Sequence, residues 1–283
     1  MAATGLPPAT DTDVARVTEA LSMITPSWNV RILLALSDGP LRYSQIADRL
    51  SWIHPGQLHP KVRLLCHAGL AERTEHASRH VTYGLTERGR QLLPALPALA
   101  SWAGEFLEQP DTPLSPVEQI EDSLALISRR QTPAILWALK AREEATARGL
   151  ARLAMPTVLW TGIYPQLRQL VDDGLVNSAG MGQPYRLTHA GHRLGGFFAG
   201  LSAWAAGRPP AHAATHPVWG NPDRVTPAPS PTWLRTPTRR PAPTTAPPPP
   251  QSTYRPAWRN AALFSHTHAA RPHAALPMGA PSR

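Results

Sequence analysis

The chain has little of the material that several protein classes need. It contains one cysteine in 283 residues, which excludes an internal disulfide or a multi-cysteine zinc site and favours a reducing compartment. It has no run of about 18 apolar residues that could cross a membrane, and its start lacks the basic and apolar regions of a secretion signal. From these absences we expect a soluble cytoplasmic protein without membrane contact.

The common motifs of catalysis and cofactor binding are also missing. There is no glycine-rich phosphate loop, no His-Glu-x-x-His zinc motif and no Gly-x-Ser-x-Gly nucleophile elbow. His266, His268 and His273 suggest a metal site, but they lie in a segment that should not fix ligand geometry, which favours solvated side chains. The sequence therefore predicts no enzyme activity, no cofactor and no metal.

Proline and arginine are unevenly distributed. From Arg208 onward, nine arginines face a single acidic residue, Asp223, so this segment holds +8 of the total charge of +9. The rest of the chain is nearly neutral, and its charge alone indicates no partner. Residues 241–250 include six prolines and should sample extended polyproline II. We therefore predict that residues 207–283 form a disordered tail rich in proline and arginine.

Three roles for this tail stay open. Its arginines could attract DNA without regard to sequence, in a way that fades with salt. It could equally be a passive solubilising extension. Four spaced aromatic residues could instead dock a partner protein: Trp219, Trp233, Tyr254 and Trp258.

The body of the chain contains an internal repeat. Helix-spaced apolar residues recur at a constant shift of 103 positions: Val14, Val17, Leu21 and Ile24 return as Val117, Ile120, Leu124 and Ile127. Residues 32–36 return at 135–139, 68–70 at 173–175, and 83–86 at 185–188, and Trp102 is matched by Trp204. We predict a disordered start at 1–12, a first domain at 13–109, a linker at 110–116 and a degenerate second copy at 117–206.

The elements of the first copy follow from residue spacing. Ser27 can cap one helix, and a short second helix starts near Ser44. A third carries an apolar stripe and ends at Gly69, and two strands around a tip at 74–79 precede a final helix. This order is typical of a winged helix-turn-helix domain; an all-α bundle with an incidental hairpin is the alternative. The predicted fold class is mainly α with small β wings (α+β), as two tandem winged helix-turn-helix domains.

The first copy resembles the HxlR-type winged-helix regulators, relatives of the MarR and PadR groups. The resemblance lies in Trp28 with residues 32–36, in residues 39–46, Ile53, 68–70 and 81–89, and in Trp102. It implies operator binding by a two-fold dimer in which each subunit supplies a recognition helix and a wing. A chain with two copies therefore resembles a dimer within one chain, with further homodimerisation left open.

The sequence departs from this pattern in three places. The N-terminal cysteine through which some HxlR-type regulators sense oxidants is missing. Pro60 and Pro165 fall in the third helix of their copies, which costs about 3 kcal/mol unless the proline lies in the first turn. The second wing, at 178–184, is short and has no cation.

DNA binding needs cations for phosphates and side chains that reach base edges. The candidate residues are Arg42, Gln57, His59, Lys61 and Arg63, with His76, Ser78, Arg79 and His80 in the wing and Arg168 in the second copy. A solvated polar surface is the alternative for any one of them. Because Gln166 replaces Lys61 in the second copy, that copy could serve mainly for dimerisation. Cys66 could sense redox state, but a packed small hydrophobe is the commoner role.

The residues and the resemblance together predict a sequence-specific transcriptional regulator that binds double-stranded DNA and acts at the nucleoid. The alternative is an adaptor whose winged helices bind another protein and read no DNA. No residue identifies a small-molecule effector. If the copies pair, the stripe of Leu92, Leu96, Leu99 and Phe106 should pack against Leu194, Phe198 and Leu201.

Overall fold

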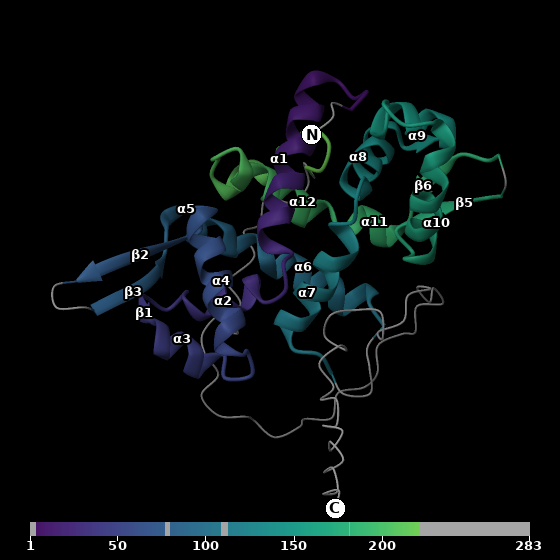
Figure 1. Ribbon diagram of the computed structural model, residues 1–283. Helices are drawn as coiled ribbons and strands as arrows, with labels where there is room; N and C mark the ends of the chain where they lie inside the picture. The colour runs from purple at the N-terminus through teal and green to yellow at the C-terminus, as the bar shows by residue number, and fades with distance from the viewer. Residues whose placement is uncertain (1–3, 77–79, 109–112, 181, 221–283) are drawn as a thin grey trace, which may run out of the picture.

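Figure 1 shows the computed structural model, which describes residues 4–76, 80–108, 113–180 and 182–220. The chain forms two successive halves, each with helices and one small sheet. The first half contains α1 (Pro8–Ile24), α2 (Asn29–Ala35), β1 (Leu41–Arg42), α3 (Tyr43–Arg49), α4 (Pro55–His67), β2 (Ala71–His76), β3 (His80–Leu85), α5 (Glu87–Leu92), η1 (Leu93–Ala95) and α6 (Leu96–Phe106). The second half contains α7 (Pro116–Ile127), α8 (Thr132–Arg142), β4 (Glu144–Ala145), α9 (Ala147–Ala154), η2 (Trp160–Ile163), α10 (Tyr164–Asp172), β5 (Val176–Ser178), β6 (Tyr185–Leu187), α11 (His189–Arg193), α12 (Gly195–Ala205) and η3 (Pro210–Ala213). None of the helices in this described part of the chain has both the length and the apolar character to cross a membrane.

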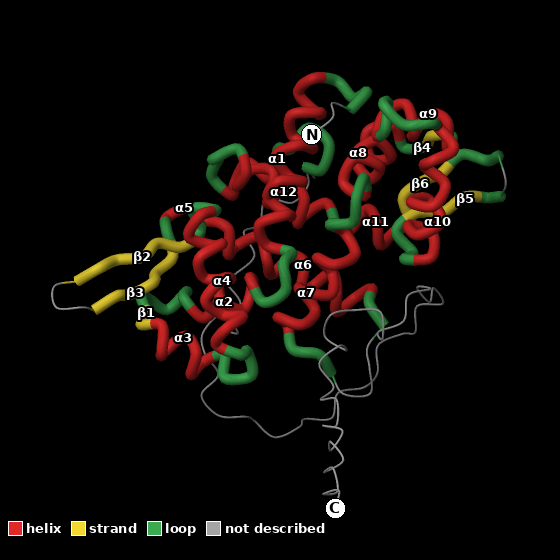
Figure 2. Tube along the Cα trace, in the orientation of Figure 1, coloured by secondary structure: helices red, strands yellow, loops and turns green. Residues whose placement is uncertain are grey.

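The two sheets share one antiparallel topology. Their strand orders are β1-β3-β2 and β4-β6-β5. In the first half, β2 and β3 pair from Ala71 opposite Leu85 to His76 opposite His80, so the pairing extends beyond Thr74, where the sequence had placed the start of the hairpin tip. In the second half, β5 and β6 pair over three residues only. The two hairpins project from different sides of the molecule, and the second is the shorter one, as expected (Figure 2).

The same local devices form both halves. Gly69 and Gly174 follow α4 and α10 in the left-handed region, at φ 68° and 70°, where glycine is favoured because it has no Cβ. The Thr86 hydroxyl accepts the Gly89 N–H at the start of α5 and donates to the Gly69 carbonyl. Thr188 makes the corresponding bonds to Gly191 and Gly174 at the start of α11. The glycine cap predicted after the third helix is confirmed.

The two prolines of the third helices lie in different positions. Pro165 is in the first turn of α10, where its missing N–H has no helical partner to lose. Pro60 lies inside α4, which begins five residues earlier at Pro55. A first-turn position is therefore excluded for Pro60. Its ring leaves the Gly56 carbonyl without an N–H donor from the next turn.

The two halves are joined through reciprocal contacts. Helix α1 of the first half packs against α8 and α12 of the second, whereas α7 of the second half packs against α2 and α6 of the first. In the same way, α5 contacts α12 and α11 contacts α6. Six of the seven apolar residues expected to pair across this junction are buried, and Phe106 is half-buried. Because α6 and η1 contact α12, the packing predicted for the two stripes is confirmed.

Two tryptophans repeat this reciprocity in hydrogen bonds. The indole N–H of Trp102, on α6, donates to the Ala190 carbonyl of α11 at 2.8 Å. The indole N–H of Trp204, on α12, donates to the Arg88 carbonyl of α5 at 2.8 Å. Each bond crosses between the halves, and the two join equivalent positions of the repeat in opposite directions.

Both ends of the body are more ordered than the sequence indicated. The disorder predicted for 1–12 is wrong for residues 4–12, because α1 already begins at Pro8 and Leu6 is buried. The disorder predicted from residue 207 is wrong for 207–220, where η3 forms and Trp219 is only 4% exposed. Trp219 packs against Trp137 and Phe198, with ring centroids 5.1 Å apart in each case, so it is no free docking motif. Residues 221–283, with the proline run, the three histidines and the other tail aromatics, lie outside the described residues.

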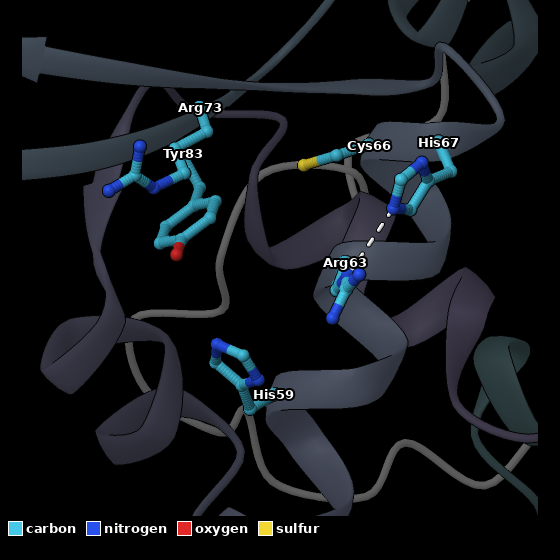
Figure 3. Close-up of a pocket in the computed structure, with 6 residues that line it drawn as sticks. All are labelled: His59, Arg63, Cys66, His67, Arg73 and Tyr83. Atoms are coloured by element: carbon cyan, nitrogen blue, oxygen red, sulfur yellow. Dashed lines mark hydrogen bonds between the residues drawn. The ribbon is translucent and has the colours of Figure 1, made fainter.

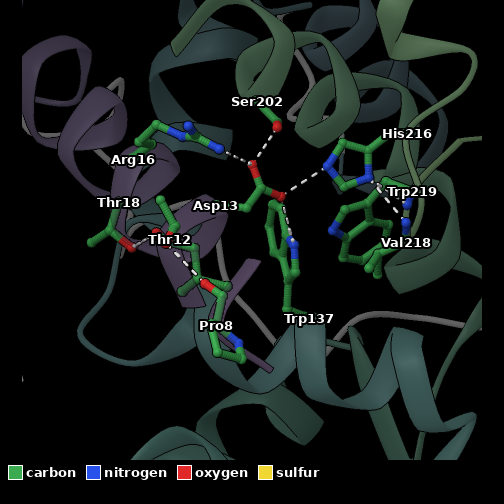
Figure 4. Close-up of polar contacts among 11 residues, drawn as sticks. Pro8, Thr12, Asp13, Arg16, Thr18, Trp137, Ser202, His216, Val218 and Trp219 are labelled. Atoms are coloured by element: carbon green, nitrogen blue, oxygen red, sulfur yellow. Dashed lines mark hydrogen bonds and ion pairs between the residues drawn. The ribbon is translucent and has the colours of Figure 1, made fainter. Parts of the chain in front are cut away.

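A buried polar cluster ties these two ends together (Figure 4). The Asp13 carboxylate of α1 accepts hydrogen bonds from the Trp137 indole N–H, at 3.1 Å, and from Ser202, and lies 2.8 Å from Nε2 of His216. Burial acts to raise the pKa of Asp13, but the hydrogen bonds from His216 and Ser202 outweigh it and hold the pKa below its usual value. Nδ1 of His216 accepts the backbone N–H groups of Val218 and Trp219. The cluster thereby fixes the chain just before the tail.

Candidate nucleic-acid interface

Helix α4 presents an outer face to solvent beside the β2–β3 wing of the first half. Its inner face is set by Leu58, Val62 and Leu65, which are buried and spaced to lie on one side of a helix. Nδ1 of His54 accepts the Gly56 N–H at 3.1 Å and caps the helix. The Tyr43 hydroxyl donates to the Pro55 carbonyl at 2.9 Å and joins α3 to the start of α4. The outer face of α4 is therefore held at a fixed position.

An open cavity of about 320 Å³ separates this face from the wing. Figure 3 shows Arg73 and Tyr83 on the strands, with His59, Arg63, Cys66 and His67 facing them from α4. The Arg63 guanidinium donates from Nε to Nε2 of His67 at 3.3 Å. Two of the six lining side chains are arginines, Arg63 and Arg73, and Arg73 is also paired with Glu75. This surface therefore offers hydrogen-bond donors suited to phosphate oxygens and base-edge acceptors.

The four candidates on α4 divide between two edges of the helix. At about 100° per residue, His59 and Arg63 lie together on the side of the wing, while Gln57 and Lys61 lie together on the other side. Lys61 is half-buried, and its Nζ lies 5.6 Å from the centre of the Trp28 ring. Burial lowers the pKa of Lys61. The structure therefore brings only His59 and Arg63 to the cavity beside the wing.

The remaining candidates of the first half lie along the wing. His76 and His80 are exposed and face each other in the last described pair of the β2–β3 ladder. Arg42 is exposed on β1, opposite Thr82 of β3, midway along the described β2–β3 ladder. Ser78 and Arg79 lie outside the described residues. The wing thus extends the surface formed by α4.

Sequence reasoning missed His67 and Arg73. Arg73 lies opposite Tyr83 in the β2–β3 ladder, and its hydrogen bond with Glu75 raises the pKa of the guanidinium. His67 stands one turn after Arg63. The spacing of four residues on a helix and the two-residue alternation on a strand could have indicated both positions. What the pattern did not contain was the angle between helix and wing.

Cys66 is half-buried in the wall of the cavity. Burial raises the pKa of its thiol, which lowers the fraction of reactive thiolate near neutral pH. This environment favours a packed side chain over a redox sensor.

The corresponding face of the second half has different chemistry. The inner residues Leu167 and Leu170 of α10 are buried like their counterparts in α4. The outer residues Tyr164 and Val171 are exposed, and Arg168 is the one cation among the described residues of this helix. On the neighbouring β6, Arg186 is engaged in an ion pair with Glu144. Among the described residues of this face, Tyr164 and Asp172 stand where α4 has His59 and His67, so the hydrogen-bond donors of α4 are only partly repeated.

Comparison with known proteins locates a family match in the first half. The HxlR-like helix-turn-helix family matches residues 23–111. An uncharacterized HTH-type transcriptional regulator of Mycobacterium tuberculosis is 35% identical over 100 residues, which are 34% of this chain and 62% of the relative. A regulator of the same description in Methanothermobacter thermautotrophicus is 34% identical over 94 residues, with 32% of this chain and 72% of the relative covered.

A solved structure matches part of the chain. The reduced form of the transcriptional regulator YodB from Bacillus subtilis is 27% identical, with 38% of this chain and 99% of that chain covered at a TM-score of 0.32. The chain spans 62% of the length of the mycobacterial relative and 72% of the archaeal one. On the family match and the identity to these relatives, the chain belongs to the HxlR-like helix-turn-helix family of transcriptional regulators.

Proposed function

We propose that this protein is a sequence-specific DNA-binding transcriptional regulator whose first half reads the operator. The observation that carries the proposal is the surface formed by α4 and the wing, where His59, Arg63, His67 and Arg73 line one cavity. Family membership supports it, because the matched residues 23–111 contain this whole surface. The protein acts by occupying its operator at the nucleoid.

The chemistry assigns different tasks to the residues of this surface. Helix α4 enters the major groove, as the third helix of a winged helix-turn-helix domain does. Arg63 can donate two parallel hydrogen bonds to the N7 and O6 acceptors of a guanine edge. The Gln57 amide can donate one hydrogen bond to N7 of an adenine and accept one from its N6 amino group. Arg42, His76 and His80 lie along the wing, where they reach the phosphates that fix the protein on the duplex.

The second half takes the place of a partner subunit in this proposal. In a two-fold dimer each contact occurs twice, with the roles of the subunits exchanged. The paired contacts of α1 with α12 and of α7 with α6 have this form, as do the bonds of Trp102 and Trp204. They support tandem duplication of one winged-helix domain and a pseudo-dimer within the chain.

Selection of bound fragments from a genomic DNA library by the full-length protein tests the proposal. We expect enrichment of a defined site, and footprinting should then locate it. Arg63→Ala should weaken binding to that site about tenfold or more, since base-edge contacts contribute roughly 1–3 kcal/mol each. Arg168→Ala is the matched control at the equivalent position of α10. We expect it to weaken binding by less than about threefold, because Arg168 would contact at most a phosphate and no base edge.

Failure to enrich any fragment over competitor DNA would overturn the proposal and favour a protein-binding adaptor. Equal losses for Arg63→Ala and Arg168→Ala would show instead that both halves read DNA.

A further inference from the structure

An apolar patch lies on the second half, where the first half has its cationic surface. It consists of Val158 (44% exposed), Leu159 (81%), Trp160 (43%), Tyr164 (44%) and Val171 (37%). These are five of the seven large exposed hydrophobic residues in the described part of the chain. Clustered exposed apolar side chains mark interaction sites more often than single ones do.

The aromatic pair of the patch has a defined geometry. The rings of Trp160 and Tyr164 lie 5.9 Å apart at an interplanar angle of 65°. They are four residues apart, across the junction of η2 and α10. Two exposed rings set at an angle, with Leu159 and Val158 beside them, resemble the aromatic surfaces that bind proline-rich segments in the polyproline II conformation.

The charges differ between the elements beside the patch. Arg168 is the one cation of α10, while Arg148 and Arg152 are exposed on α9, which packs against η2. Asp172 is exposed at the end of α10, beside Val171. A ligand with an apolar stretch next to a positive charge would match both features.

We propose that the apolar patch binds the proline-rich run of the same chain, residues 241–250. The run is preceded directly by Arg239 and Arg240, which match Asp172 in charge. Twenty residues separate Gly220, the last described residue, from position 241. Fully extended, they span up to about 66 Å, whereas a compact body of this length has a radius of gyration of about 17 Å. The run can therefore reach the patch.

Site-specific photocrosslinking in the full-length protein tests this occupant. Leu159 is replaced by p-benzoylphenylalanine, and crosslinked peptides are identified by mass spectrometry in a mixture of ¹⁵N-labelled and unlabelled protein. We expect crosslinks to residues 235–259 within one isotopic species. The matched control carries the same residue at Leu64, which is 54% exposed on the outer face of α4, and should give no such peptides. Crosslinks between isotopic species would show that a second copy covers the patch and would overturn the proposal, as would a yield no higher than in the control.

Trypsin cleavage gives an independent measurement. Docking of the run should protect the neighbouring bonds after Arg235 and Arg239, while the bond after Arg259 serves as internal reference. Cleavage after Arg235 and Arg239 follows the fraction of molecules in which the run is undocked. If the docked form is about ten times more populated than the undocked form, the double variant Trp160→Ala/Tyr164→Ala should speed cleavage at these two bonds about tenfold relative to the bond after Arg259. Trp52→Ala, which removes an exposed tryptophan of the first half, should leave the ratio unchanged. A ratio unaffected by the double variant would contradict the proposal.

Discussion

Helices α4 and α10 are held in the body in the same way but present different surfaces. Leu58 and Val62 of α4 are buried, as are Leu167 and Leu170 of α10, and each helix is followed by a left-handed glycine. Outside, α4 carries His59, Arg63 and His67, while α10 carries Tyr164 and Val171. Inner contacts set the fold and outer residues set the partner, so a repeat can keep the first while it changes the second.

The largest effect is expected when the two halves are separated. The first half alone, residues 1–112, would expose Leu96, Leu99 and Trp102, which now pack at the junction of the halves. Exposure of each such side chain costs about 1.5–3 kcal/mol. The cost for all three side chains is a large part of the free energy of unfolding of a domain, which is roughly 5–15 kcal/mol. We expect no folded monomer of either half, and recovery of a single species when both are co-expressed, measured by size-exclusion chromatography and circular dichroism.

A first half that unfolds cooperatively as a monomer, at the temperature of the whole chain, would show that the junction contributes little. The two halves would then be domains that fold independently of each other.

Two glycines test whether the halves share the same internal packing. A methyl group on Gly89 or Gly191 would overlap the carbonyl oxygen of Leu70 or Leu175. Gly89→Ala and Gly191→Ala should each lower the free energy of unfolding by about 3 kcal/mol, because overpacking forces the backbone apart. Urea denaturation measures the loss.

Gly196→Ala serves as control, since a Cβ at Gly196 would meet no atom within 4 Å. We expect it to change stability by no more than about 1 kcal/mol. A harmless Gly191→Ala beside a damaging Gly89→Ala would break the equivalence of the halves.

The smallest effect concerns the two tryptophan bonds. Trp102→Phe and Trp204→Phe each remove one donor from a backbone carbonyl, which should lower the free energy of unfolding by about 1 kcal/mol. The loss should be slightly greater for Trp204, because the Arg88 guanidinium also lies over its ring, 5.0 Å from the centroid. Thermal melting of both single variants and of the double variant checks this. A loss confined to one tryptophan would mean that the junction is not symmetric in energy.

Much of the fold could be predicted from the sequence because its signals are local or repeated. Periodic apolar residues marked the helices, Gly69 marked the end of α4, and the repeat, at a shift of 102 to 105 positions, indicated which stripes would meet. The ordered structure of residues 207–220 could not be predicted in this way. Proline content pointed to disorder, whereas His216 and Trp219 are held by Asp13 and Trp137, far away in the chain.

The candidate site was predictable in part for the same reason. His59 and Arg63 are placed by helical spacing alone. Lys61 is not, because the ring that covers it belongs to Trp28, whose left-handed backbone at φ 72° is not indicated by any residue type. Arg73 joins the site only through the angle of the wing, which depends on packing between distant segments.

The cluster around Asp13 has a consequence for the concentration at which the tail meets its partners. Because His216 and Trp219 are anchored in the body, the eight arginines that follow Gly220 start from a fixed point rather than from a loose connection. A tethered segment is present near its own body at an effective concentration in the millimolar range for short linkers. Cellular protein levels do not alter that value. Weak contacts of the tail, with the body or with DNA beside it, can therefore be occupied at any expression level.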